Sequence, residues 1–405
     1  MSLFDPSQEH WTPRSFPAET LFAPGQKFGP TRYDERFAAA EADVDAGFRG
    51  VTTDGAVVPG LYQLASTGLS LDRVRQALRA LVNALTPAQR AQVQMPVDAR
   101  DVRLWHGLFT RRLRHGVALE EMTDLQRWRV EDVIESSFSP RGSRVVADIR
   151  RTSDLIGQVT GLFVDFGRDV YWLSVLGDLS GSEPWGWQLD GHHVNVTFVV
   201  VGDQVVMTPT FLGAEPTIIE SGPYAGIHLF QEEQSDGAGV FAALSSQQRE
   251  TAIIASELTP EVFAGPFRDN LELGYAGISA TEFDETQLAT LRRLIVTYTG
   301  YLPSGHSGLR YEEVLAHLDD TFFAWIGGME GTPPFYYRVQ SPVVLIEFEH
   351  IFGVGLEGDD HSANHVHTAV RTPNGNDYGL DLIRQHRERA HDPDVGAGRG
   401  EKGDL

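Results

Sequence analysis

The sequence predicts an α+β protein in which a largely antiparallel sheet carries a histidine-rich site and segregated helices pack around it. Helical spacing of apolar residues dominates residues 70–160, whereas strand-like alternation dominates residues 161–230 and 335–372. Helices and strands that occur in separate runs are typical of this fold class. Two histidine clusters, at His192-His193 and His365-Val366-His367, fall within the strand-rich segments.

The composition is that of a folded globular protein. Of the 405 residues 41% are apolar and 22% are charged, which is close to the average of globular domains. The chain has no cysteine, so disulfides and thiolate ligands are excluded, and any transition metal must be bound by imidazole and carboxylate groups. The first twenty residues do not resemble a secretory signal, and we expect a cytoplasmic protein.

The formal net charge of −23 limits the partners. It makes the electrostatic part of nucleic-acid binding unfavourable and opposes docking on anionic membranes. No run of eighteen apolar residues predicts a transmembrane helix. A small-molecule substrate is the partner that remains, with neither nucleic acid nor membrane.

One large domain is expected between two polar ends. Residues 1–35 are rich in proline and lack periodicity, which predicts an N-terminal arm. Residues 36–389 form the expected α+β domain. Residues 390–405 are polar and glycine-rich, which predicts a flexible tail.

Helices are predicted first, from spacing and capping. Between residues 70 and 85 the apolar residues recur every three or four positions, with Ser70 as the expected N-cap. Thr86-Pro87 starts a second helix, and similar starts occur at Leu244-Ser245 and Thr259-Pro260. We interpret these similar starts as shared capping chemistry and not as a repeat. Residues 119–138 and 285–299 also have helical spacing.

Strands are predicted in three stretches. Residues 169–212 are rich in β-branched and aromatic side chains, and Gly202-Asp203 separates two apolar runs as a hairpin turn. Residues 335–352 form the second stretch. Residues 364–371 form the third, which ends at a turn over residues 372–375.

The first histidine cluster lies at the expected start of a strand. Because side chains alternate along a strand, His193 shares a face with Asn195 and Thr197, whereas His192 shares the apolar face with Val194. This alternation favours His193 as a metal ligand. Since strand starts often bend, His192 is retained as a second candidate.

The second cluster, His365-Val366-His367, is the stronger signal. On a strand the two imidazoles lie on one face with their Cα atoms roughly 6 to 7 Å apart, a span that two ligands of one ion can close. Glu347 alternates on the preceding strand and is a candidate fourth ligand or general base. Zinc, copper, iron and manganese all accept imidazole, so the sequence does not choose among them.

Arg371 follows on the same strand face, with the small residue Ala369 between it and His367. A guanidinium there could bind a substrate carboxylate or phosphate in a bidentate manner. The alternative is a structural ion pair with Glu347 or Asp377, and the sequence favours neither.

The chain also resembles the bacterial domain of unknown function 3500 family over most of its length. The resemblance rests on motifs that occur in the same order, and it marks both histidine segments as family features. The motifs are Thr52-Thr53-Asp54-Gly55, Pro59-Gly60-Leu61, Trp185-Gly186-Trp187, Asp190-Gly191-His192-His193, Phe211-Leu212-Gly213-Ala214, Phe335-Tyr336-Tyr337-Arg338, Ile346-Glu347-Phe348, the segment from Asn364 to Arg371 and Asn376-Asp377-Tyr378-Gly379. His350 departs from the pattern, because similar sequences carry Asp or Asn there.

Three functions fit these features. The first is a metal-dependent enzyme in which His192 or His193, His365 and His367 hold an ion that activates water for hydrolysis or elimination, with Glu347 as base and Arg371 on an anionic substrate. The second is a copper or iron oxidoreductase that binds dioxygen at the same ligands. The third is a metal- or ligand-binding protein without turnover.

Overall fold

The computed structural model describes residues 30–354, 356 and 360–390. Residues 1–29 of the expected arm and residues 391–405 of the expected tail lie outside this range. The first described element is the helix α2 (Pro30–Asp45). Among the helices of the described residues, none combines the length and the apolar character needed to cross a bilayer.

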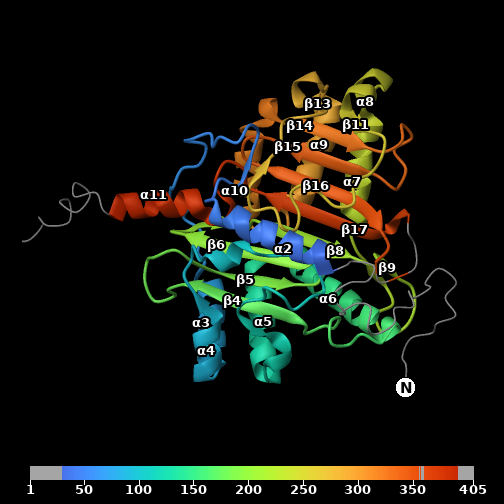
Figure 1. The fold of residues 1–405 in the computed structure, drawn as a ribbon. Helices are drawn as coiled ribbons and strands as arrows, with labels where there is room; N and C mark the ends of the chain where they lie inside the picture. The colour runs from blue at the N-terminus through green and yellow to red at the C-terminus, as the bar shows by residue number, and fades with distance from the viewer. Residues whose placement is uncertain (1–29, 355, 357–359, 391–405) are drawn as a thin grey trace, which may run out of the picture.

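One 13-stranded sheet forms the centre of the molecule and confirms the α+β class (Figure 1). Its main path runs β11 (Ile253–Ala255), β14 (Phe322–Ile326), β15 (Tyr336–Gln340), β16 (Leu345–Phe352), β17 (His361–Arg371), β8 (Thr210–Ala214), β6 (Val194–Val201), β5 (Trp185–Gly191), β4 (Tyr171–Gly177) and β2 (Gln94–Met95). The strands β13 (Ile278–Ser279), β3 (Val117–Ala118) and β7 (Gln204–Val206) pair beside this path. All of these pairings are antiparallel except β2 with β4 and β11 with β14. The hairpin expected at Gly202-Asp203 is present, because Val201 pairs with Gln204.

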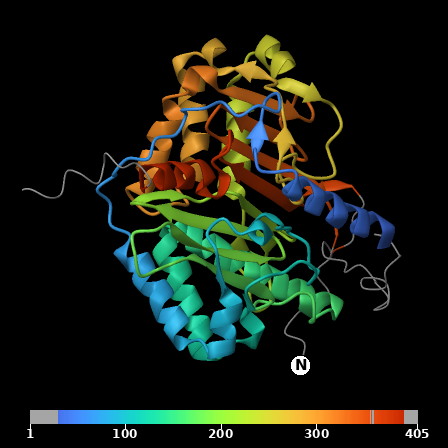
Figure 2. The same cartoon turned by 60° about the vertical axis from the view of Figure 1, so that its left-hand side comes forward.

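Five helices bury their apolar sides against one face of this sheet, with which they form the largest apolar core. They are α3 (Asp72–Ala84), α5 (Asp124–Ser137), α6 (Pro140–Thr160), α7 (Gln231–Ala243) and α9 (Glu285–Thr299). Figure 2 shows α3, α5, α7 and α9 on one side of the sheet and α2 on the other. The short helices α4 (Pro87–Val93), α8 (Ser246–Ala252), α10 (His306–Leu315) and α11 (Leu380–Ala390) complete the α-helices that the structure describes.

Of the four helix starts that the sequence predicted from capping residues, two are confirmed and two differ. Thr86 and Ser245 each form a capping box, as expected for α4 and α8. The N-cap of α3 is Leu71 and not Ser70, whose hydroxyl instead accepts a hydrogen bond from the Asp72 amide. The prediction of a helix that starts at Thr259-Pro260 is wrong. This segment is a loop, in which the Thr259 hydroxyl donates to the buried carboxylate of Glu349.

Two of the three similar starts, Thr86-Pro87 and Leu244-Ser245, occupy corresponding places in an internal duplication, which corrects the interpretation of them as shared capping alone. Leaving out the short connecting elements, the same order of helices and strands occurs twice along the chain. The first half has the order α3, α4, β2, β3, α5, α6, β4, β5, β6, β8, and the second has the order α7, α8, β11, β13, α9, α10, β14, β15, β16, β17. The central strands β8 and β17 pair with each other and join the two halves into one sheet. Figure 1 shows the first half below this junction and the second half above it.

The sheet face opposite the helices is polar yet buried. Register places His367 between Gly213 on β8 and Glu349 on β16, so all three residues lie on this face. Loops cover it and pair with its polar groups. Gln188 donates to the Val102 carbonyl, for example, and Gln340 donates to the Leu273 carbonyl. The histidines of the candidate site therefore lie on this buried polar face, beneath the loops that cover it.

Candidate metal centre

Three buried histidines meet on the polar face of the sheet. His193 comes from the connection between β5 and β6, and His365 and His367 come from β17. One potential ligand atom of each lies within 4.8 Å of those of the other two. Their exposed fractions are 5%, 1% and 7%, so water reaches them only through a cavity. The structure therefore brings together three of the four histidines expected as ligands.

His192 and His193 form the turn of a hairpin and not the start of a strand. Gly191 pairs with Val194, so the two histidines are the whole two-residue loop. His193 has a φ of +61° whereas His192 has no positive φ, and a left-handed second central residue is the pattern of a type II turn. Strand alternation therefore does not set its direction, although the ligand that alternation favoured, His193, is the one that meets the β17 histidines.

His192 supports the ring of its neighbour. The two imidazoles stack with ring centroids 3.8 Å apart, and the His192 Nδ1 lies 3.2 Å from the Ser153 hydroxyl. Phe166 packs edge-on against the other side of His192 at 4.8 Å. These contacts make His192 part of the wall behind His193.

Hydrogen bonds fix which nitrogen of each β17 histidine is free. The Nδ1 of His365 lies 2.8 Å from the Phe352 carbonyl, which can only accept, so this nitrogen carries the proton. The Nδ1 of His367 lies 2.7 Å from a carboxylate oxygen of Glu261 and donates in the same way. Both Nε2 atoms therefore keep a lone pair. A second partner that fixes the tautomer is the usual arrangement for a metal-binding histidine.

The Nε2 of His365 lies 3.1 Å from the Nε2 of His193 and accepts a hydrogen bond from it, because His365 carries its own proton on Nδ1. Among the described residues the buried Nε2 of His367 has no hydrogen-bond partner. A buried nitrogen without a partner costs free energy unless something binds it. This orphaned atom beside two other imidazoles fits a metal ion of the kind that nitrogen ligands prefer.

Burial favours the neutral form of His193, His365 and the neighbouring His192. Desolvation lowers the pKa of His193 and His365 well below the usual range, and neighbouring histidines lower it further. Desolvation also lowers the pKa of His192 to about 3. Neutral imidazole is the form that binds a metal, so little proton competition is expected at neutral pH.

Glu347, the expected base or fourth ligand, is fully buried on β16 and its oxygens are already bound. It accepts hydrogen bonds from the amides of Phe263 and Ala264 and from the Tyr336 hydroxyl. Burial raises its pKa, which these hydrogen bonds partly offset. Glu347 anchors the loop above the sheet and is not among the described residues that line the cavity at the histidines.

Two carboxylates other than Glu347 reach the histidines, and the sequence indicated neither. Glu261 hydrogen-bonds the Nδ1 of His367, and a carboxylate oxygen of the buried Glu215 lies 3.7 Å from the Nδ1 of His365. The pattern Thr259-Pro260 was interpreted as a helix start, which would have pointed Glu261 to solvent. The only signal was negative, because the residues after Pro260 lack helical apolar spacing. Contact across 106 residues of chain cannot be read from local pattern.

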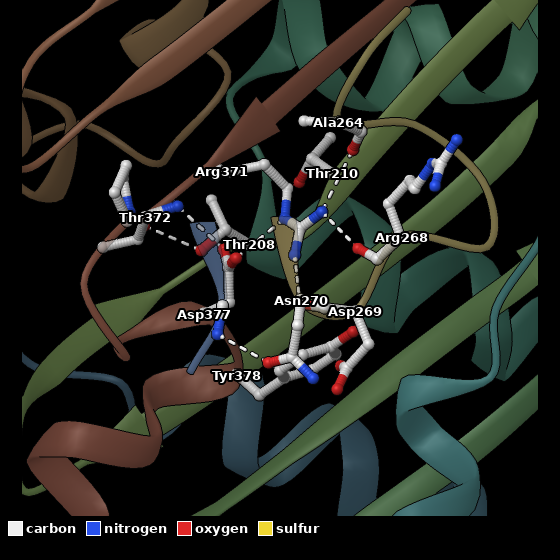
Figure 3. Close-up of polar contacts among 12 residues, drawn as sticks. Thr208, Thr210, Ala264, Arg268, Asp269, Asn270, Arg371, Thr372, Asp377 and Tyr378 are labelled. Atoms are coloured by element: carbon white, nitrogen blue, oxygen red, sulfur yellow. Dashed lines mark hydrogen bonds and ion pairs between the residues drawn. The ribbon is translucent and has the colours of Figure 1, made fainter. Parts of the chain in front are cut away.

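Arg371 is not part of the histidine group. Its Nε donates to Asp377 at 2.7 Å, and its other nitrogens donate to the carbonyls of Ala264, Arg268 and Asp269 (Figure 3). The side chain is fully buried, and it is absent from the described lining of the cavity. Of the two roles that the sequence left open, the structure shows the ion pair with Asp377. A role on substrate stays a prediction that these contacts do not favour.

A cavity of about 130 Å³ opens over the three histidines. Its wall is mostly apolar, and it adjoins an outer groove of about 610 Å³ between α2 and the loop 259–268. Four residues line both spaces, which makes them the boundary between cavity and groove: Arg36, Leu108, Pro260 and Glu261. A small molecule that enters through the groove would meet the free histidine nitrogens.

Comparison with known proteins gives a family without a described activity. No curated protein and no solved structure matches the chain. The model of the family described as protein of unknown function (DUF3500) matches residues 67–380, which include all three histidines. Because this match covers well over half of the chain, the protein belongs to the DUF3500 family.

Proposed function

We propose that the protein is a metal-dependent enzyme that binds a transition ion through His193, His365 and His367 and acts on a small molecule in the cavity above them. The observation that supports this most directly is the convergence of three buried imidazoles at the base of a cavity, one of them with an Nε2 that has no hydrogen-bond partner among the described residues. Three protein ligands with an open position are typical of catalytic rather than structural metal sites.

The residues around the proposed ion would have two roles: some orient the histidine ligands, and others line the cavity. The Phe352 carbonyl and Glu261 hold the protons of His365 and His367 at Nδ1, and this presents both Nε2 lone pairs to the ion. Apolar wall residues, among them Phe109 and Ile351, limit the water in the cavity. A bound ion of this class lowers the pKa of water or polarises a substrate oxygen. Zinc fits an all-imidazole set with an open position, and copper and iron remain alternatives.

A redox function at the same site is the second candidate. An all-nitrogen ligand set suits copper as well as zinc. The common iron site with two histidines and one carboxylate is less well matched, because Glu261 contacts the Nδ1 of His367 and does not belong to the group of convergent ligand atoms. The third candidate, a metal-binding protein that catalyses no reaction, would contain the metal but convert no substrate.

Metal analysis of protein purified without a histidine tag tests the proposal. We expect about one transition ion per chain, and the double variant His365→Ala/His367→Ala should contain none. Restoring zinc or copper to the metal-free wild type should raise its melting temperature, because a ligand that binds only the folded state stabilises it. A wild type that neither contains metal nor responds to added zinc, copper, iron or manganese would contradict the proposal.

A further inference from the structure

The mouth of the cavity carries one fixed positive charge, on Arg36 of α2. Among the described lining residues, Arg36 is the single arginine or lysine. Arg36 is exposed, and no hydrogen bond or ion pair ties its guanidinium to any other residue that the structure describes. In a chain with a net charge of −23, a cation that lines the boundary of this cavity without an ion-pair partner among the described residues could attract an anionic ligand.

The backbone of Arg36 is held in place by its neighbours on α2. The next residue, Phe37, is 2% exposed and packs edge-on against His106 and Phe267, with ring centroids 5.2 and 5.1 Å away. Further along α2, Asp43 accepts a hydrogen bond from the Asn270 amide at 2.9 Å. The position of Arg36 at the boundary is therefore set by the packing of α2, although its side chain is free to adjust.

The cavity has three zones that a ligand must match. The histidines form the base, Arg36 lies at the boundary with the outer groove, and apolar side chains lie between them. These apolar residues are Leu108, Phe109, Pro260, Ile351, Phe352 and Val354. The one carboxylate of the wall, Glu261, is already engaged by the His367 Nδ1 and by the Val262 amide.

We infer that the ligand of this site is a small carboxylate whose acid group is bound by Arg36 and whose apolar body extends toward the histidines. A guanidinium presents two parallel N–H donors that match a carboxylate, and the apolar wall suits a short hydrocarbon or aromatic body. The inference rests on the proposed function for the reaction at the base of the cavity. It moves the anion-binding role that the sequence suggested for Arg371 to a residue on another element.

Binding of butyrate and benzoate, each compared with its neutral amide, tests this inference. Isothermal titration of the metal-free protein measures the contribution of Arg36 without any metal, and the visible spectrum of the cobalt-loaded protein reports whether the ligand reaches the ion. We expect saturable binding of the carboxylates and much weaker binding of the amides. Arg36→Ala should weaken carboxylate binding about tenfold or more, as expected for the loss of a charged hydrogen bond.

Arg268→Ala is the matched control, because Arg268 is an exposed cation that lines the outer groove but not the inner cavity. We expect it to change carboxylate affinity by less than about twofold, since a charge outside the cavity acts only through screened solvent. Equal binding of acid and amide, or unchanged carboxylate binding by Arg36→Ala, would overturn the inference even if cobalt binds. If neither cobalt nor zinc, copper, iron or manganese binds while carboxylate binding still depends on Arg36, the proposed metal function is contradicted and the carboxylate site is not.

Discussion

His193 shows how a single backbone conformation builds the candidate centre. Its φ of +61° turns the chain between two strands, while its amide donates to the Gly107 carbonyl and its carbonyl accepts from the Gly213 amide. The ring is thereby directed at His365 and His367 from a neighbouring element. Because the turn and not the side chain fixes this direction, a residue that tolerates the turn can replace the ligand without loss of fold.

The variant His193→Asn tests this separation of turn and ligand. Asparagine tolerates the left-handed conformation but is too short to replace the imidazole. We expect it to lose the metal while its melting temperature stays near that of the metal-free wild type. His192→Phe, which keeps a stacking ring, should retain metal. The measurements are the metal content and the melting temperature of the two variants. Loss of metal in His192→Phe and its retention in His193→Asn would show that His192 is the ligand.

Arg371 is expected to serve the fold. Arg371→Lys keeps the charge but cannot reach Asp377 and three carbonyls together. Losing one hydrogen bond to a charged group costs about 1.5–3 kcal/mol, and we expect the free energy of unfolding to fall by at least this amount. Chemical denaturation measures it, with metal content as the control. Normal stability combined with weakened carboxylate binding would restore the substrate role suggested by the sequence.

At the scale of elements, the centre depends on how closely β8 and β17 approach. A side chain at Gly213 would place its Cβ 2.7 Å from the Cδ2 of His367 and 3.1 Å from the Cδ2 of His193. The absence of a side chain at Gly213 thus leaves room for both rings. The loop 259–264 closes the site from above, tied to the sheet by Glu347 and Glu349.

Gly213→Ala should therefore weaken metal binding more than it weakens the fold. We expect the added methyl group to displace both rings and to lower zinc affinity about 10–100-fold, the range found when groups that orient metal ligands are removed. Gly308→Ala in α10 is the control, since its Cβ would meet nothing within 4 Å. Competition with a zinc chelator measures both. Unchanged affinity in Gly213→Ala would show that the rings can adjust freely.

The sequence predicted a helix or strand correctly where the spacing of residues within that one element identifies it, and it missed features that depend on contacts between distant segments. Alternation placed β17 with His365 and His367 on one face correctly, because period and face are properties of one strand. Helix α7 was not predicted, since Gly237 and Gly239 interrupt it and its pattern is barely amphipathic. The partners of the histidines, Glu261 and the Phe352 carbonyl, come from segments whose approach depends on tertiary packing.

The molecule consists of two similar halves that are joined by the pairing of β8 with β17. Among the described residues the histidine cluster is present once, at this junction. Corresponding bonds recur across the duplication. Gln126 donates to the Ala84 carbonyl at 2.9 Å, and Gln287 donates to the Ala243 carbonyl at 3.0 Å. In the second half the corresponding turn, residues 341–344, is longer and carries no histidine, so the cluster is not repeated there. The duplication is visible in order and pairing rather than in residue identity, so the capping signals alone did not indicate it.

Gln126→Ala and Gln287→Ala test whether the halves are equivalent parts of one cooperative unit. Each variant leaves a carbonyl without its partner at a nearly buried position, and each should cost about 1–3 kcal/mol of unfolding free energy. The two sites lie in different halves, so the double variant should show the sum of both costs. Because the sheet is continuous through β8 and β17, chemical denaturation followed by tryptophan fluorescence and by circular dichroism should give one coincident transition. Two separate transitions, each shifted by only one of the variants, would mean that the halves unfold independently and that the β8–β17 pairing beside the histidines is the weakest part of the sheet.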